Sequence, residues 1–208
     1  MKNLRHFDRS VVLIATLALF AGDVAAQEPE ATSTAQKLLE RGALPETLQR
    51  AEAEPGNVEA TFFAAQAAAK MSDDGRAIAE YSRLRESADA SWQAIGESGA
   101  LFTQGNLDGA LQAATRATEA NGENPYAHYQ LGLVVNRQEN NERALEAFTR
   151  AIQLKPDFAY AHYYAGLAAQ RLREIAKMSE HFAIFLKLAP EAPERTAVAA
   201  ILRTMRPR

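Results

Sequence analysis

Histidines are the first residues to test for chemistry, because they bind metals and move protons near neutral pH. The chain has four, and two of them, His128 and His162, stand 34 residues apart. A metal site would need carboxylates or further histidines at ligand spacing, and none are in register. We therefore interpret His128 and His162 as packing residues and expect no metal.

Motifs for other chemistry are missing from the sequence. It contains no nucleophile elbow, no glycine-rich phosphate loop and no paired-carboxylate motif. Asp73 and Asp74 fit the start of a helix, where a carboxylate caps backbone N–H groups. The absence of cysteine excludes thiol chemistry and a lipoprotein anchor. The sequence thus predicts a protein that is not an enzyme and needs no cofactor.

The number and distribution of charged residues bear on whether the partner is a nucleic acid. The net charge is −3, and no block of like charges occurs. A nucleic-acid binder needs a basic stripe to displace counterions. We expect no nucleic acid as a partner.

The first 26 residues have the pattern of a secretory signal peptide. Basic residues precede an apolar run from Val11 to Ala21, and Val24-Ala25-Ala26 provides small residues for cleavage. The run has 11 residues, whereas a membrane span needs about 20. We predict a signal at 1–26, export to the periplasm or, second, release outside the cell, and no stable membrane span after cleavage.

The elements that follow are helices in pairs. A polar flexible leader is expected at 27–34, and helical patterns punctuated by Gly, Pro and Asn run from there. In the second half of the sequence, residues that stand 34 positions apart match. Ala127-His128-Tyr129 matches Ala161-His162-Tyr163, Gly132 matches Gly166, and Phe148 matches Phe182. Units this small must stack to bury their apolar faces.

This pattern resembles the tetratricopeptide repeat (TPR) family, here of an exported bacterial type. The resemblance implies an all-α, right-handed α-solenoid of about four hairpins within 58–192, at about 58–90, 91–124, 125–158 and 159–192. Capping helices are expected at 35–57 and 193–208. The register of the second unit is open, because one alternative places Glu97 at a core position. The family's tryptophan is replaced by Thr61, His128 and His162, and its asparagine clamp positions hold Gln66, Gly99, Leu133 and Leu167.

The first helix of each unit has two stripes of residues at helical spacing. One stripe is needed to pack on the neighbouring helix, and the second stripe must face something else. In the family these positions line a concave groove for ligand peptides. The resemblance thus implies a protein-binding groove formed by Trp92, Tyr126, Tyr129, Asn136, Arg137, Tyr160, Tyr163, Gln170 and Arg171. The alternative is that the tyrosines pack on the next unit and the arginines face helix C-termini.

The expected function is a protein-binding adaptor or scaffold of the cell envelope, which holds a partner segment in the concave groove. The alternative is a structural subunit that assembles with copies of itself or within a larger secretion or cell-wall machine. Fold alone does not identify the partner protein or peptide.

Overall fold

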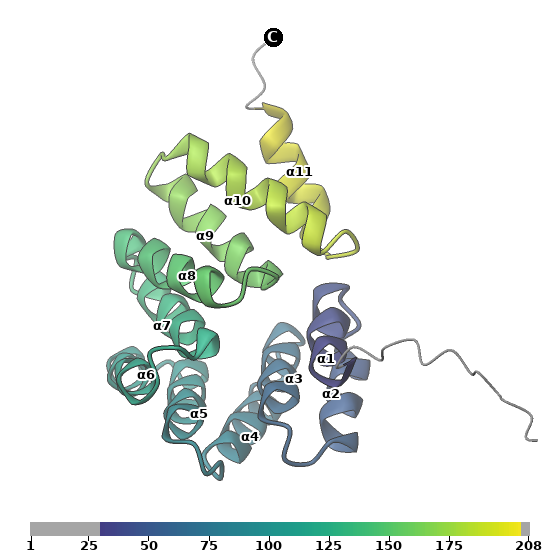
Figure 1. Cartoon of the computed structure of the whole chain (residues 1–208), viewed down its shortest axis with the longest axis vertical. Coiled ribbons are helices and arrows are strands. Elements are labelled where there is room, and N and C mark those ends of the chain that lie inside the picture. Colours follow the sequence, from purple (N-terminus) through teal and green to yellow (C-terminus); the bar gives the residue numbers. More distant parts are fainter. Residues whose placement is uncertain (1–29, 205–208) are drawn as a thin grey trace, which may run out of the picture.

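The computed structural model describes residues 30–204, with side chains from Thr34 onward, and this part of the chain is all helical. The helices are α1 (Glu30–Glu40), α2 (Leu44–Ala53), α3 (Val58–Lys70), α4 (Asp74–Leu84), α5 (Ala90–Thr103), α6 (Leu107–Ala120), α7 (Pro125–Arg137), α8 (Asn141–Leu154), α9 (Ala159–Arg171), α10 (Ile175–Leu188) and α11 (Arg195–Thr204). Consecutive helices pack as hairpins from α3–α4 to α9–α10, with α1–α2 and α11 at the ends (Figure 1). The predicted all-α solenoid of four hairpins is confirmed.

Each turn inside a hairpin has the same construction. A residue in the left-handed region ends the first helix, at Ser72, Gly105, Glu139 and Arg173. In three of these turns the next residue caps the second helix: Asp73, Asn106 and Asn140 each accept a hydrogen bond from a backbone N–H three residues on. The expected capping role of Asp73 is confirmed.

Two glycines allow the helices of one hairpin to approach closely. A Cβ atom on Gly132 would lie 2.5 Å from the Phe148 ring, and one on Gly166 would lie 2.5 Å from the Phe182 ring. Such distances are too short for a side chain, so α7 can pack on α8, and α9 on α10, only with glycine there.

The array curves until its ends meet. Aromatic side chains of the first hairpin contact those of the third and fourth: Phe62 and Tyr126 have ring centroids 5.3 Å apart, and Phe63 and Phe158 6.0 Å apart. Figure 1 shows the hairpins in a ring, with α1 and α11 on the same side of the molecule. The inside of the ring is therefore filled by the protein's own core.

Several boundaries differ from expectation. Helix α1 begins at Glu30, so the predicted flexible leader 27–34 is wrong from that residue on. Glu97 is only partly buried and pairs with Arg116 at 2.8 Å, so it does not occupy a core position. The predicted signal peptide lies outside the described residues. Within residues 30–204, no helix is both long and apolar enough to cross a membrane.

Candidate protein-binding site

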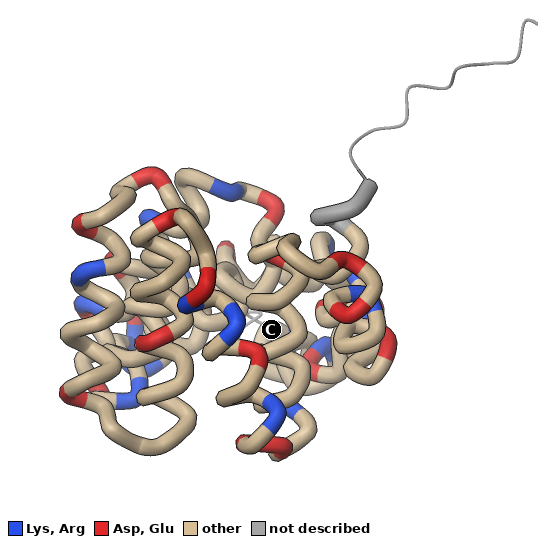
Figure 2. The backbone as a smooth tube through the Cα atoms, turned by 90° about the horizontal axis from the view of Figure 1, so that it is seen from below, with Lys and Arg blue, Asp and Glu red and all other residues tan. Residues whose placement is uncertain are grey.

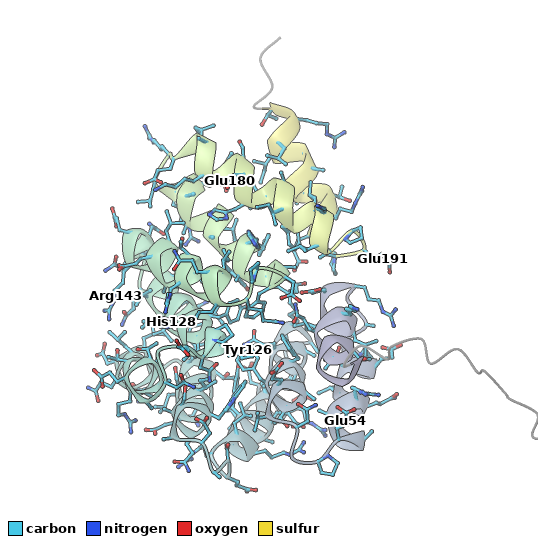
Figure 3. The ribbon with its side chains drawn as sticks, viewed as in Figure 1. Glu54, Tyr126, His128, Arg143, Glu180 and Glu191 are labelled. Atoms are coloured by element: carbon cyan, nitrogen blue, oxygen red, sulfur yellow. The ribbon has the colours of Figure 1, made fainter. Side chains whose placement is uncertain are left out.

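The predicted groove residues divide into a buried group and an exposed group. Four aromatic residues, Trp92, Tyr126, Tyr129 and Tyr160, are between 1% and 8% exposed. They do face the inside of the ring, and Figure 3 shows Tyr126 near the centre of the molecule. The expectation that they line an open groove is wrong for this structure, because the ring is too tight to leave a channel between them.

The hydroxyl groups of the buried tyrosines have polar partners within the fold. Tyr126 donates a hydrogen bond to Glu59 at 2.5 Å, and Tyr160 donates one to Glu194 at 3.0 Å. Burial, together with the neighbouring carboxylates, raises the pKa of both phenols. Both phenols therefore remain neutral hydrogen-bond donors, and their role is to stabilise the fold.

Glu194 joins the two ends of the array. Its carboxylate also accepts a hydrogen bond from Lys70 of α3 at 2.7 Å, and that ammonium lies 4.3 Å from the centre of the Tyr160 ring. Burial would raise the pKa of Glu194, but the hydrogen bond and the charge of Lys70 outweigh it and hold the pKa below its ordinary value.

Tyr163 and Gln170 are half-buried and belong to neither group. The Tyr163 ring packs on Phe185 and Tyr164, with centroids 5.2 Å from each. Neither residue lines the open surface described next.

Asn136 and Arg137 do line an open hollow, of about 560 Å³, where the first helices of the hairpins end. We call it the basic hollow. It lies between the C-terminal ends of α3, α5 and α7, and Tyr164 of α9 completes it. Its apolar lining comes from Phe102, Leu107, Leu133 and Tyr164, and its polar lining includes Gln66, Lys70, Asp74, Asn136 and Arg137.

Positive charge dominates the rim of the basic hollow. Arg137 is exposed and has no ion pair or side-chain hydrogen bond among the described residues. Arg171 donates hydrogen bonds to two neutral amides, Asn136 at 2.7 Å and Asn141 at 3.5 Å. Asp74 is the one acidic residue in the described lining. Arg137 thus lines the hollow, and Arg171 contacts the lining residue Asn136; neither guanidinium group has a carboxylate partner among the described residues.

Sequence reasoning missed Phe102, Thr103 and Tyr164, and did not assign Gln66 and Leu133 to the site. The repeat register could have identified Gln66 and Leu133, because they occupy equivalent positions in the first and third repeats. Gly99 and Leu167 occupy that position in the second and fourth repeats. Phe102 and Tyr164 lie off this register and meet the others only because the array is curved.

A second hollow, of about 670 Å³, lies outside the ring between α6, α8 and α10. Its charged lining has both signs: Glu142, Glu146 and Glu174 accompany Arg143, Arg150 and Lys177. Figure 3 shows Arg143 at the periphery, and Figure 2 shows both signs interspersed along the chain. This surface therefore offers a charged ligand no net attraction.

The histidines make contacts within the fold. His128 Nε2 lies 2.9 Å from the carbonyl of Gly122. His162 Nδ1 lies 3.2 Å from His181 Nδ1, which joins α9 to α10. Burial lowers the pKa of both members of this pair. Among the described residues, no group of three His, Asp or Glu side chains could hold a metal ion.

Comparisons with known proteins agree with this architecture. The family model for the tetratricopeptide repeat matches residues 99–157 and again 136–193. Among solved structures, TTC0263, a thermophilic TPR protein of Thermus thermophilus, is 18% identical, with 84% of this chain and 98% of that chain covered and a TM-score of 0.59.

Two further structures are YrrB, a TPR protein with an unusual peptide-binding site, and the first TPR of Spaghetti (RPAP3) bound to an HSP90 peptide. YrrB is 18% identical over 84% of this chain and 91% of its own, with a TM-score of 0.50. The Spaghetti domain is 20% identical over 55% and 90%, with a TM-score of 0.50. No curated protein matches the sequence.

The chain is thus a TPR-type α-solenoid, and the family-model match over residues 99–193 supports its place in the tetratricopeptide repeat family. These matches indicate no enzymatic family. At identities this low, the solved structures establish the fold and not the ligand.

Proposed function

We propose that this protein is a non-catalytic scaffold that holds a segment of a partner protein in the basic hollow. The observation that carries the proposal is the pair Arg137, which lines the hollow, and Arg171, which contacts its lining residue Asn136; neither has a carboxylate partner among the described residues. Peptide binding by YrrB and by the Spaghetti domain supports a protein partner.

The chemistry of the hollow defines the partner segment. Leu133 and Phe102 offer apolar surface for an aliphatic or aromatic side chain. A guanidinium has forked donors that match a carboxylate. The segment that fits best has an apolar anchor next to an acidic side chain or a free C-terminus.

The test is selection from a random peptide library displayed with free C-termini, followed by affinity measurements on the selected peptides. We expect acidic, apolar peptides, and a loss of about 30-fold or more in affinity when Arg137→Glu and Arg171→Glu are combined. Arg143→Glu, on the outer surface, is the matched control and should bind like the parent. If Arg143→Glu abolishes binding and the double variant does not, the outer hollow is the site.

We further propose that the scaffold acts in the cell envelope and that its compartment is the periplasm. The support is the basic, apolar and small-residue succession in residues 1–26. N-terminal sequencing of the exported protein should then begin at Gln27 or within a residue or two of it. Recovery of the full-length chain from membranes would contradict export as a cleaved protein.

Self-assembly is the second candidate function. Met71 and Ile175, which lie at or beside turns inside the hairpins, are 46% and 45% exposed and are the large apolar side chains most open to solvent in the described chain. Light scattering on the purified protein tests this candidate, which predicts an oligomer that Met71→Glu with Ile175→Glu dissociates. A monomer at all concentrations would exclude it.

A further inference from the structure

Helix α1 makes a polar contact with the turn between α8 and α9. The side-chain amide of Gln36 donates one hydrogen bond to Glu40 at 2.8 Å and another to the carbonyl of Asp157 at 3.0 Å. The backbone of Ala159 also hydrogen-bonds the Glu40 carboxyl group. These four residues, which we call the latch, join the first helix of the described chain to the last hairpin.

Glu40 is an unusual residue for such a place, because its side chain can carry a charge. It is 6% exposed, and no ion pair with a Lys or Arg compensates it within the described residues. A buried carboxylate without a cationic partner is costly, whereas the protonated acid is not. Burial raises the pKa of Glu40 to about 7, because its effect outweighs the hydrogen bonds from Gln36 and Ala159, which favour the ionised form. The negative charge of Asp157 adds a smaller increase.

The charges around Glu40 offer it little compensation. Lys155 is paired with Asp157 at 3.1 Å, so its positive charge is shared. Lys37 and Arg41 on α1 and Glu191 beyond α10 line the same small hollow as Glu40, and the neutral phenols of Tyr126, which is bonded to Glu59, and of Tyr160 lie within reach of its charge. Lys37, Arg41 and Glu191 are exposed to solvent, which screens their charges.

We propose that α1 is a pH-sensitive latch: the ring is closed while Glu40 is protonated, and ionisation of Glu40 releases α1 from the α8–α9 turn. Release exposes the aromatic interior around Phe63 and Phe158, which is covered in the closed ring. The direction of the pH dependence follows from the linkage between proton binding and ring closure. A carboxyl group that binds its proton more tightly in the closed form favours closure at low pH and loses that effect as pH rises through about 7.

The absence of cysteine makes the distance across the latch measurable. Arg41 and Glu191 are exposed and line the same small hollow between the ends of α1 and α10. Arg41→Cys with Glu191→Cys, labelled with nitroxides, reports closure as a distance in pulsed electron paramagnetic resonance. This readout requires no partner, so its failure would leave the proposed function untouched.

We expect a single short distance at about pH 6 and a second, longer population at about pH 8.5, with the open-to-closed ratio about tenfold higher at the higher pH. Burial lowers the pKa values of His162 and His181, so their protonation belongs to the acid side of this window and does not produce opening at the higher pH. In the same labelled background, Glu40→Gln should keep the short distance at both pH values. Glu46→Gln, an exposed carboxyl group on α2, should behave like the parent. An unchanged distance in the parent, or equal opening in Glu40→Gln, would overturn the proposal.

Discussion

At the scale of single residues, the turns inside the hairpins contain strain that glycine would relieve. Ser72, Glu139 and Arg173 have φ near +60°, a conformation that costs an L-residue about 1–2 kcal/mol. The equivalent residue of the second hairpin is Gly105, with φ of 80° and nothing near its would-be Cβ. The same turn is thus built with and without glycine in one chain.

We predict that Glu139→Gly raises the free energy of unfolding by about 1 kcal/mol, because its exposed side chain makes no described contact that would be lost. The reciprocal change, Gly105→Ala, should lower it by about the same amount. Urea denaturation of both variants measures this. Equal stabilities for Glu139→Gly and the parent would mean that the turn is unstrained.

A second residue-scale prediction concerns the His162–His181 pair. Burial lowers both pKa values, so the folded protein takes up protons less readily than the unfolded chain. Stability contributed by the neutral pair is present above about pH 6.5 and is lost as pH falls. His181→Gln should therefore show a shallower loss of stability between about pH 7 and pH 5 than the parent, in parallel thermal melts. Identical slopes would show that the pair does not titrate on unfolding.

At the scale of helices, packing depends on a few small residues that the repeat period identifies. Gly132 recurs as Gly166 at the 34-residue period, and the structure places each against a phenylalanine ring of its own hairpin. Helix positions and hairpin pairing could be predicted because they depend on local periodicity and capping residues such as Asp73. The start of α1 at Glu30 was not predicted, because residues 30–34 (EATST) are mostly polar.

Gly132→Leu should lower the free energy of unfolding by about 1–3 kcal/mol or more, since the new side chain would collide with Phe148. Gly75→Ala is the control: its Cβ would meet only Asp73, at 3.7 Å, and helix propensity should make it neutral or stabilising. Thermal melts compare the two. A melt unchanged by Gly132→Leu would show that α7 and α8 are not packed as described.

At the scale of the whole molecule, curvature decides which predicted site residues remain accessible. The aromatic residues of the second stripe are buried, because small rotations between units add up over the array. The total rotation determines whether Tyr126 contacts Phe62 across the ring. No local sequence pattern predicts that rotation. Asn136, Arg137 and Arg171 stay accessible because they lie at the helix ends, beyond the closed interior.

The central claim is that the tyrosines of the inner stripe form the core while the arginines at the rim are free to bind. The free energies of unfolding of Tyr129→Ala and Arg137→Ala, measured by urea denaturation, test it without a partner. Tyr129 is 3% exposed and lies 4.5 Å from Phe158, so Tyr129→Ala should cost about 3–5 kcal/mol. Arg137→Ala should change stability by less than about 0.5 kcal/mol. A Tyr129→Ala variant as stable as the parent would contradict the account, because it would place that tyrosine on an open surface.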